Sequence, residues 1–166
     1  MVEMRVQRVG IDPQRNAVLI LADSEGRRLL PVYIGFYEAQ AIALAIAGES
    51  IGRPLTHDLL LSVLSALGGH LDEIWITRLV DRTFYAVLRV SAHGRTLEID
   101  SRPSDAVALA VRTGARILVA EQVLAVAQVV DTDADEEEEE EAERFRDLLE
   151  HIDFDNLDEE SPDEEA

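Results

Sequence analysis

The sequence of 166 residues contains neither cysteine nor lysine. Without cysteine, the protein forms no disulfide, no thiolate zinc site and no cysteine nucleophile. Without lysine, it cannot use Schiff-base chemistry, P-loop phosphate binding or a nuclease metal site completed by a lysine. All 15 basic residues are arginines, and only four histidines are present. The candidate chemistry is therefore limited to carboxylates, arginines, hydroxyl groups and a few imidazoles.

Long apolar segments and common catalytic motifs are also missing. The longest apolar stretch, residues 39–47, contains Gln40 and is far shorter than the roughly 20 residues of a membrane span. The first ten residues lack the apolar core of a signal peptide. No G-x-S-x-G, H-E-x-x-H, G-x-G-x-x-G or EF-hand pattern occurs. We therefore expect a soluble, cytoplasmic protein with no membrane partner and no organic cofactor.

The charge of the chain is unevenly distributed. Hydrophobic residues make up 47% of the sequence, which is enough for a packed core, and the net charge is −19. Residues 131–166 hold 20 acidic and two basic residues, a charge of −18, so residues 1–130 carry only −1. This contrast predicts a nearly neutral globular domain at residues 1–130 and an acidic tail at residues 131–166.

The acidic tail contains one segment with a regular apolar pattern. Six consecutive glutamates at residues 136–141 repel one another. After them, apolar residues at helical spacing predict an amphipathic helix at about residues 140–152. The apolar stripe consists of Ala142, Phe145, Leu148, Leu149 and Ile152. This helix either docks on the domain, which is the interpretation we favour, or recruits a protein partner.

Hydrophobic periodicity in residues 1–130 predicts an α+β fold with a mixed sheet of six to seven strands. The strands are expected at residues 2–11, 17–22, 28–34, 71–80, 83–91, 95–100 and 117–120. Alanine-rich helices are expected to pack on the sheet. They are predicted at residues 37–47, at 57–67 with Thr56 as the N-cap, from about residue 104 to 113, and, as a short helix, at 121–127.

A pattern of three strands and a helix occurs twice. Residues 41–46 are similar to residues 106–111, and residues 17–19 are similar to residues 86–88, at offsets of 65 and 69 residues. The unequal offsets leave two explanations open, a βββα duplication and the chance similarity of alanine-rich helices. A duplication would relate the N-termini of the two helices by a pseudo-two-fold axis.

Polar and charged residues stand at the start of all three longer predicted helices. Glu38 begins the first, Thr56 to Asp58 begin the second, and Arg102 to Asp105 begin the third. Capping and the helix dipole account for serine, threonine and acidic residues at such positions. They do not account for Arg102, which can bind a phosphate bidentately, or for His57, which can act as a general acid or base.

The carboxylates near these helix starts are candidate metal ligands. Glu38, Asp58, Asp100 and Asp105 can hold a divalent cation, Mg²⁺ or Mn²⁺, if the fold brings them together. Adjacent helical residues point about 100° apart, so His57 and Asp58 cannot both face one atom without help.

Aromatic residues and the remaining histidines give weaker signals. Tyr33, Trp75, Phe84 and Tyr85 lie in predicted strands, where core packing is the simplest role. Phe36 and Tyr37 can stack on a base beside Glu38, although burial is the simpler expectation. Of the other histidines, His70 and His93 lie by turns and are expected to face solvent.

Five segments together resemble the bifunctional nuclease family. They are LPVYIG at residues 30–35, EAQAIAL at 38–44, RPLTHDL at 53–59, TFYA at 83–86 and SRPSDAVALA at 101–110. The resemblance covers about residues 1–130, and the tail is similar to those of actinobacterial members. It implies an α+β domain that acts on DNA and RNA. The positions that match family motifs are Glu38, His57, Asp58, Arg102, Ser104 and Asp105.

Two functions are therefore weighed. In the first, the protein is a metal-assisted phosphodiester hydrolase acting on DNA or RNA, with His57, Asp58, Arg102, Ser104 and Asp105 as candidate catalytic residues. In the second, it is a non-enzymatic binding or regulatory module whose tail helix recruits a protein. The domain's charge of −1 offers no broad basic surface for nucleic acid. A second copy of the chain is a further candidate partner.

Overall fold

The structure is a computed structural model that describes residues 1–127 and 130–131. Within them, the chain forms eight strands and four helices. The strands are β1 (Val2–Ile11), β2 (Ala17–Asp23), β3 (Arg28–Ile34), β4 (Gly69–Val80), β5 (Thr83–Ala92), β6 (Arg95–Ser101), β7 (Arg116–Val119) and β8 (Val130–Asp131). The helices are α1 (Phe36–Ala47), α2 (Thr56–Ala66), α3 (Pro103–Thr113) and α4 (Glu121–Val126).

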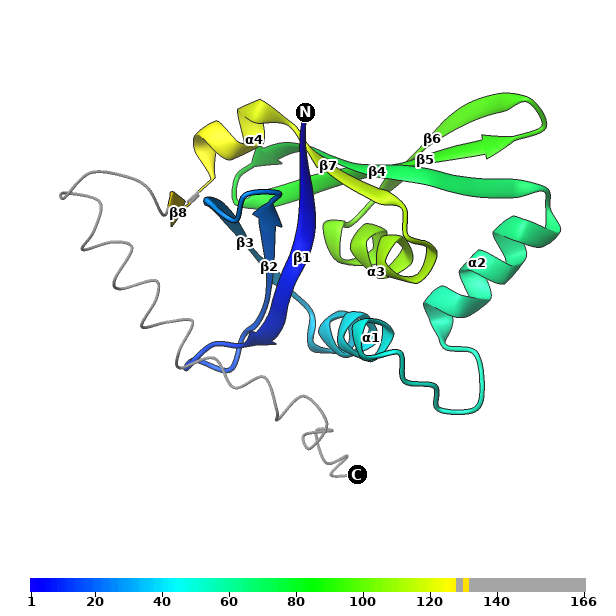
Figure 1. The fold of residues 1–166 in the computed structure, drawn as a ribbon, viewed down its shortest axis with the longest axis horizontal. Helices are drawn as coiled ribbons and strands as arrows, with labels where there is room; N and C mark the ends of the chain where they lie inside the picture. The colour runs from blue at the N-terminus through cyan, green and yellow to red at the C-terminus, as the bar shows by residue number, and fades with distance from the viewer. Residues whose placement is uncertain (128–129, 132–166) are drawn as a thin grey trace.

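All described strands belong to one mixed sheet, which confirms the predicted α+β class. Its order is β6-β5-β4-β7-β1-β2-β3-β8 (Figure 1). Strands β4 and β7 run parallel, and every other described pair is antiparallel. The seven predicted strands are all present. Strand β8 was not predicted, because two residues are too few to show a periodicity.

Short turns set the register of the second meander, β4-β5-β6. The β4–β5 turn consists of Asp81 and Arg82, with φ of 48° and 63°. The β5–β6 turn consists of His93 and Gly94, with φ of 50° and 73°. Two consecutive positive φ angles are typical of type I′ turns, whose twist matches that of the flanking strands. The exposed position of His93 confirms the expectation that it faces solvent.

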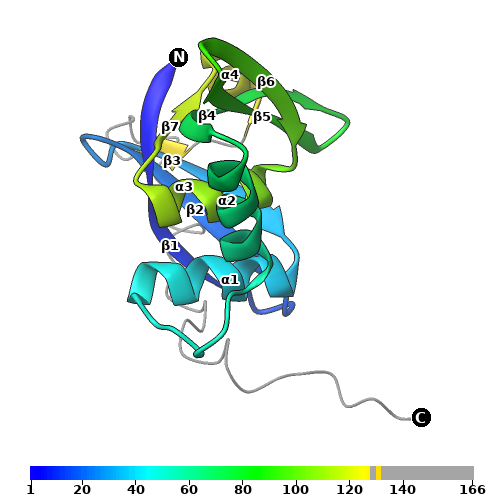
Figure 2. The ribbon, with the colours of Figure 1, turned by 90° about the vertical axis from the view of Figure 1, so that its right-hand side faces the viewer.

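Helix α3 lies at the centre of the domain. Its residues Ala106 to Ala110 are all buried, and it packs against α1, α2, β4 and β5. Alanine lets the neighbouring backbones approach closely, so a helix that is apolar on every side fits here. Helix α2 lies at the flank, facing the viewer in Figure 2, and none of its residues is buried.

Strand β2 is buried along its whole length, as its continuous apolar sequence predicts. Leu19 and Leu21 belong to the core that the helices share. Val18 and Ile20 alternate with them along the strand and therefore face the opposite side of the sheet. They are also buried, at 1% and 0% exposure, although they are not part of that shared core.

The fold repeats the topology that a duplication would produce. The β1-β2-β3 meander and the β4-β5-β6 meander lie on either side of β7, each followed by a helix of the pair α1 and α3, which pack together. Glu38 and Asp105 are each the third residue of their helix. Asp58 is also the third residue of its helix, α2, because the helix dipole favours acidic residues in the first turn of any helix. The acidic positions therefore do not separate duplication from chance similarity.

Two details predicted from the sequence are wrong, and one prediction lies outside the described residues. Helix α2 begins at Thr56, so its N-cap is Leu55 and the expected capping role of Thr56 is wrong. Tyr33 is 59% exposed, so its expected place in the core is also wrong. The predicted tail helix at residues 140–152 lies outside the described residues. None of the helices described here has the length and apolar composition needed to cross a membrane.

Because β2 is fully buried, truncating one of its core side chains should lower the free energy of unfolding. Leu19 has 0% exposure and lies in the shared core, so Leu19→Ala is expected to lower the free energy of unfolding by about 2–5 kcal/mol. Val80, 47% exposed beside the β4–β5 turn, provides the control, and Val80→Ala should cost less than about 1 kcal/mol. Urea denaturation measures both. Equal losses would contradict this assignment of the core.

Candidate functional site

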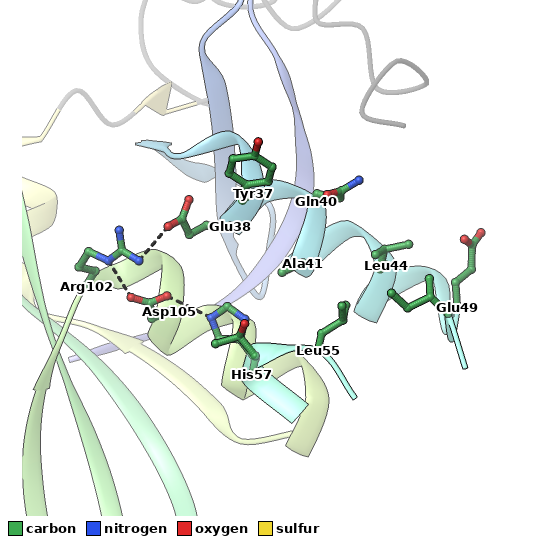
Figure 3. Close-up of a pocket in the computed structure, with 12 residues that line it drawn as sticks. Tyr37, Glu38, Gln40, Ala41, Leu44, Glu49, Leu55, His57, Arg102 and Asp105 are labelled. Carbon is green, nitrogen blue, oxygen red and sulfur yellow. Dashed lines mark hydrogen bonds and ion pairs between the residues drawn. The ribbon is translucent and has the colours of Figure 1, made fainter. Parts of the chain in front are cut away.

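Four of the predicted site residues line one open cleft of about 650 Å³. Figure 3 shows them: Glu38 from α1, His57 from α2, and Arg102 with Asp105 from the start of α3. The sequence separates Glu38 from Arg102 by 64 residues and His57 from Asp105 by 48. The fold thus brings the first turns of three helices together.

Arg102 connects two of these helices. It is the N-cap residue of α3. Its Nε donates to Asp105 Oδ2 at 2.7 Å, and its Nη2 donates to Glu38 Oε1 at 2.8 Å. The hydrogen bond and negative charge of Asp105, then the hydrogen bond to Glu38, raise the pKa of Arg102 further. The side chain is nevertheless 65% exposed, so the guanidinium remains open to a ligand in the cleft.

His57 reaches the other oxygen of the same carboxylate. Its Nε2 lies 3.0 Å from Asp105 Oδ1, and its side chain is 12% exposed. Burial raises the pKa of Asp105, but hydrogen bonds from Arg102 and His57 outweigh burial, and the pKa lies below 3.8. Because Asp105 is ionised at neutral pH, the hydrogen bond assigns the proton of a neutral His57 ring to Nε2. Nδ1 is then the acceptor nitrogen.

Gly35 makes room for Glu38, a role that the sequence analysis missed. Gly35 is the N-cap residue of α1, and a Cβ atom at this position would lie 2.0 Å from Glu38 Oε2. The Glu38 side chain therefore folds back over its own helix start, in the space that a larger residue would fill. In the sequence, Gly35 stands out only as the last residue of the LPVYIG segment.

Asp58 does not face the cleft. Its Oδ1 accepts a hydrogen bond from Arg112 Nε at 2.7 Å, and its Oδ2 accepts one from the backbone N–H of Leu55 at 2.8 Å. The hydrogen bond from Arg112, followed by that from Leu55, lowers the pKa of Asp58. This placement agrees with the expected divergence of His57 and Asp58, and it ties the start of α2 to α3.

Ser104 and Asp100 also lie outside the cleft. Ser104 is buried, with 5% exposure, and α3 has no side-chain cap. Asp100 is exposed near the end of β6 and lines an adjoining, mainly apolar pocket of about 620 Å³. His57, Arg102 and Asp105 border that pocket as well. The structure therefore brings together four of the seven predicted site residues.

The predicted metal ligands do not form a ready-made site. No group of three or more histidine, aspartate or glutamate side chains among the described residues can hold a metal ion. Glu38 and Asp105 each hold Arg102, whose guanidinium lies where two carboxylates would share a cation. Asp58 holds Arg112 instead. The donor set in this arrangement does not fit a divalent ion.

Other residues define the shape of the cleft. Tyr37, expected to be buried, is 63% exposed and lies along the edge of the cleft (Figure 3). Phe36 is half-buried and packs edge-to-face against it, with 5.7 Å between ring centroids. Leu44, Ile51 and Leu55 add apolar surface, and none of the three was predicted as a site residue. The cleft therefore combines an accessible aromatic ring with a compact polar cluster.

Comparison with known proteins decides the family. The model of the bifunctional nuclease domain matches residues 19–132, a range that includes all four cleft residues. The chain belongs to the bifunctional nuclease domain family. It is similar to two uncharacterized proteins, MT1877 and Rv1829, from the CDC 1551 / Oshkosh and ATCC 25618 / H37Rv strains of Mycobacterium tuberculosis. Each is 41% identical over 163 residues, covering 98% of this chain and 96% of the relative.

The ion pair between Asp58 and Arg112 should contribute to stability in a pH-dependent way. Arg112 is only 9% exposed, but Asp58 is 42% exposed and solvent screens the pair, so Asp58→Asn is expected to lower the free energy of unfolding by about 1 kcal/mol at pH 7. The folded-state pKa of Asp58 lies below its unfolded value, so this contribution is present above about pH 4 and is lost as the pH falls further. Urea denaturation at pH 7 and pH 3 measures the difference between variant and parent.

The matched control is Asp100→Asn, which removes an exposed carboxylate of the same type and should change stability by less than about 0.5 kcal/mol. A difference between Asp58→Asn and the parent that is as large at pH 3 as at pH 7 would contradict the ion pair as its cause.

Proposed function

We propose that this protein hydrolyses phosphodiester bonds of nucleic acid in the cleft formed by Glu38, His57, Arg102 and Asp105. The observation that carries the proposal is the chain of hydrogen bonds from His57 through Asp105 to an exposed Arg102. Membership of a family described as bifunctional nucleases agrees with it. The substrate class is DNA or RNA.

Arg102 is the proposed phosphate-binding residue. Its guanidinium offers N–H donors at the open side of the cleft, and Nη1 makes no hydrogen bond within the described part of the chain. Planar donors of this kind match two non-bridging phosphate oxygens and stabilise the negative charge that develops on them in the transition state. Glu38 and Asp105 hold the guanidinium in position before the substrate arrives.

His57 is the proposed general base. Its Nδ1 takes a proton from the attacking water or hydroxyl group as the new P–O bond forms and the bond from phosphorus to the leaving oxygen breaks. The leaving oxygen lies on the opposite side of phosphorus and takes its proton from solvent, to which His57 then releases its own. Asp105 is a positioning residue, because its contact with Nε2 orients the ring and stabilises the imidazolium form. Tyr37 at the edge of the cleft offers a face on which a base can stack.

A divalent ion remains a prediction of the sequence, and no step of this proposal depends on one.

A second candidate is a non-enzymatic binding or regulatory module. The contacts that support catalysis also tie α1, α2 and α3 together, and residues 1–130 carry a charge of only −1. The two candidates predict different effects on stability and activity when a cleft residue is replaced. Loss of a structural contact lowers stability, whereas replacement of a catalytic residue lowers activity and is often neutral for stability.

Replacement of His57 separates the two candidates. His57→Gln keeps a polar side chain but no proton-transfer group, so kcat for DNA or RNA cleavage is expected to fall about 10²–10⁴-fold. The control is His93→Gln in the exposed β5–β6 turn, which should retain full activity. Cleavage of single- and double-stranded DNA and RNA is measured with Mg²⁺, with Mn²⁺ and with EDTA, beside the thermal midpoint of each variant. Equal activity of His57→Gln and the parent protein, or no cleavage by the parent protein, would reject the hydrolase.

Replacement of Gly35 tests the position of Glu38. In Gly35→Ala, the new methyl group would occupy the place of Glu38 Oε2, so the side chain should rotate away and release Arg102. We expect kcat/KM to fall about tenfold or more, because a poorly held guanidinium binds the transition state less well. Gly48→Ala is unsuitable as a control because its φ is 68°. Ala47→Gly, at the far end of α1, is suitable. Unchanged kcat/KM in Gly35→Ala would contradict the role of Glu38.

A further inference from the structure

We propose that residues 142–152 dock on the face of the β1-β2-β3 meander that points away from the helices. This surface, here called the outer face, consists of Val18, Ile20 and Ala22 of β2 with their cross-strand neighbours Arg5, Arg8, Leu29, Pro31 and Tyr33. The proposal is independent of the function of the cleft.

The centre of the outer face is apolar. Val18, Ile20 and Ala22 are 1%, 0% and 1% exposed, yet none belongs to the core shared with the helices. The described helices cover the other side of this meander (Figure 1). These side chains are therefore buried on a side of the sheet that no described helix covers, and their burial stabilises the fold only if another segment lies over them.

The border of the outer face along β1 is basic. Arg8 lies opposite Ile20, and Arg5 lies opposite Ala22. Residues directly opposite each other in antiparallel strands point to the same side of the sheet. An apolar row with arginines beside it matches a segment that has an apolar stripe and acidic neighbours.

Residues 142–152 have this chemistry. Phe145, Leu148, Leu149 and Ile152 repeat at helical spacing, so a helix would present them on one side. Residues 131–141 immediately before them include nine acidic residues. The segment can therefore supply apolar contact to Ile20 and negative charge to the arginines of β1.

The end of the described chain lies beside the outer face. Strand β8 pairs with β3, with Val130 opposite Leu29 and Asp131 opposite Arg28. Ten residues, 132–141, separate this point from the proposed docking segment. They can span up to about 33 Å, whereas neighbouring strands are only about 5 Å apart. The segment can reach any part of the outer face.

The other exposed apolar surface fits the segment less well. Helix α2 exposes Leu59, Leu60 and Val63 at 58%, 46% and 46%, followed by Leu67 at 68%. Residues 59–71 contain no charged residue, so this surface offers no arginine to an acidic segment. In addition, α2 and β8 lie at opposite ends of the molecule in Figure 1. The outer face is therefore the better site.

A spin label in the full-length chain tests the location. Because the protein has no cysteine, Asp147→Cys provides one labelling position on the side of the segment opposite its apolar stripe. We expect a nitroxide there to broaden the amide resonances of β1, β2 and β3 in the same ¹⁵N-labelled chain, and to leave those of α2 sharp. Broadening of α2 or of the cleft instead, or no broadening of any described element, would overturn the proposal.

A mixed sample distinguishes a second copy from the same chain. Spin-labelled unenriched protein is added to ¹⁵N-labelled protein without a label. Sharp resonances in the mixture, with broadening in the singly labelled chain, support docking within one molecule. Broadening in the mixture would show that the segment docks on another copy, and this too would overturn the proposal.

A pair of substitutions measures the contribution to stability. Leu149→Ser removes part of the apolar stripe and should lower the thermal midpoint of the full-length protein by about 4–8 °C. Asp147→Ser introduces the same residue on the opposite side and should shift the midpoint by about 2 °C or less. Arg8→Glu should weaken the contact and reduce the effect of Leu149→Ser. Equal midpoints for Leu149→Ser and Asp147→Ser would overturn the proposal.

Discussion

The guanidinium of Arg102 holds two carboxylates, one from each half of the domain. Glu38 and Asp105 both stand in the first turn of a helix, where the N-terminal dipole favours negative charge. Two such charges would repel each other across the junction of α1 and α3. Arg102 lies between them and bonds to both. The polar lining of the cleft and the orientation of His57 through Asp105 depend on this cation, whereas buried apolar residues hold α1 against α3.

The halves of the domain have similar topology but different chemistry. Each half is a three-stranded meander followed by a helix whose third residue is acidic. The N-cap residues differ, however, because Gly35 leaves space for Glu38 whereas Arg102 supplies the cation. Helix α2, inserted between the halves, adds the imidazole of His57. The two helix starts that meet at the cleft thus differ in their N-cap residues, and α2 adds a side chain that neither half supplies.

Local patterns predicted most of the fold, and distant contacts were harder to predict. Seven strands and four helices follow from periodicity, because apolar spacing reports which side of each element is buried. The sequence identified Glu38, His57, Arg102 and Asp105 only as a set of candidates, since it does not show which side chains meet. Asp58 looked equivalent to His57, but a helix turns by about 100° per residue and directs it to Arg112. Burial was the simpler expectation for Tyr37, because an aromatic side chain is usually packed in a core. Its 63% exposure follows from the shape of the cleft, which the sequence does not show.

Helix α2 has a consequence for how the cleft opens. None of its residues is buried, and its first turn is held by His57 on Asp105 and by Asp58 on Arg112. Elements with so few buried contacts separate from a protein at a lower free energy than global unfolding requires. Arg102 and Asp105 belong to α3, whose middle is fully buried. His57 is therefore carried by the least anchored of the three helices, and breathing of α2 alone would widen the cleft while the arginine and its two carboxylates stay in place.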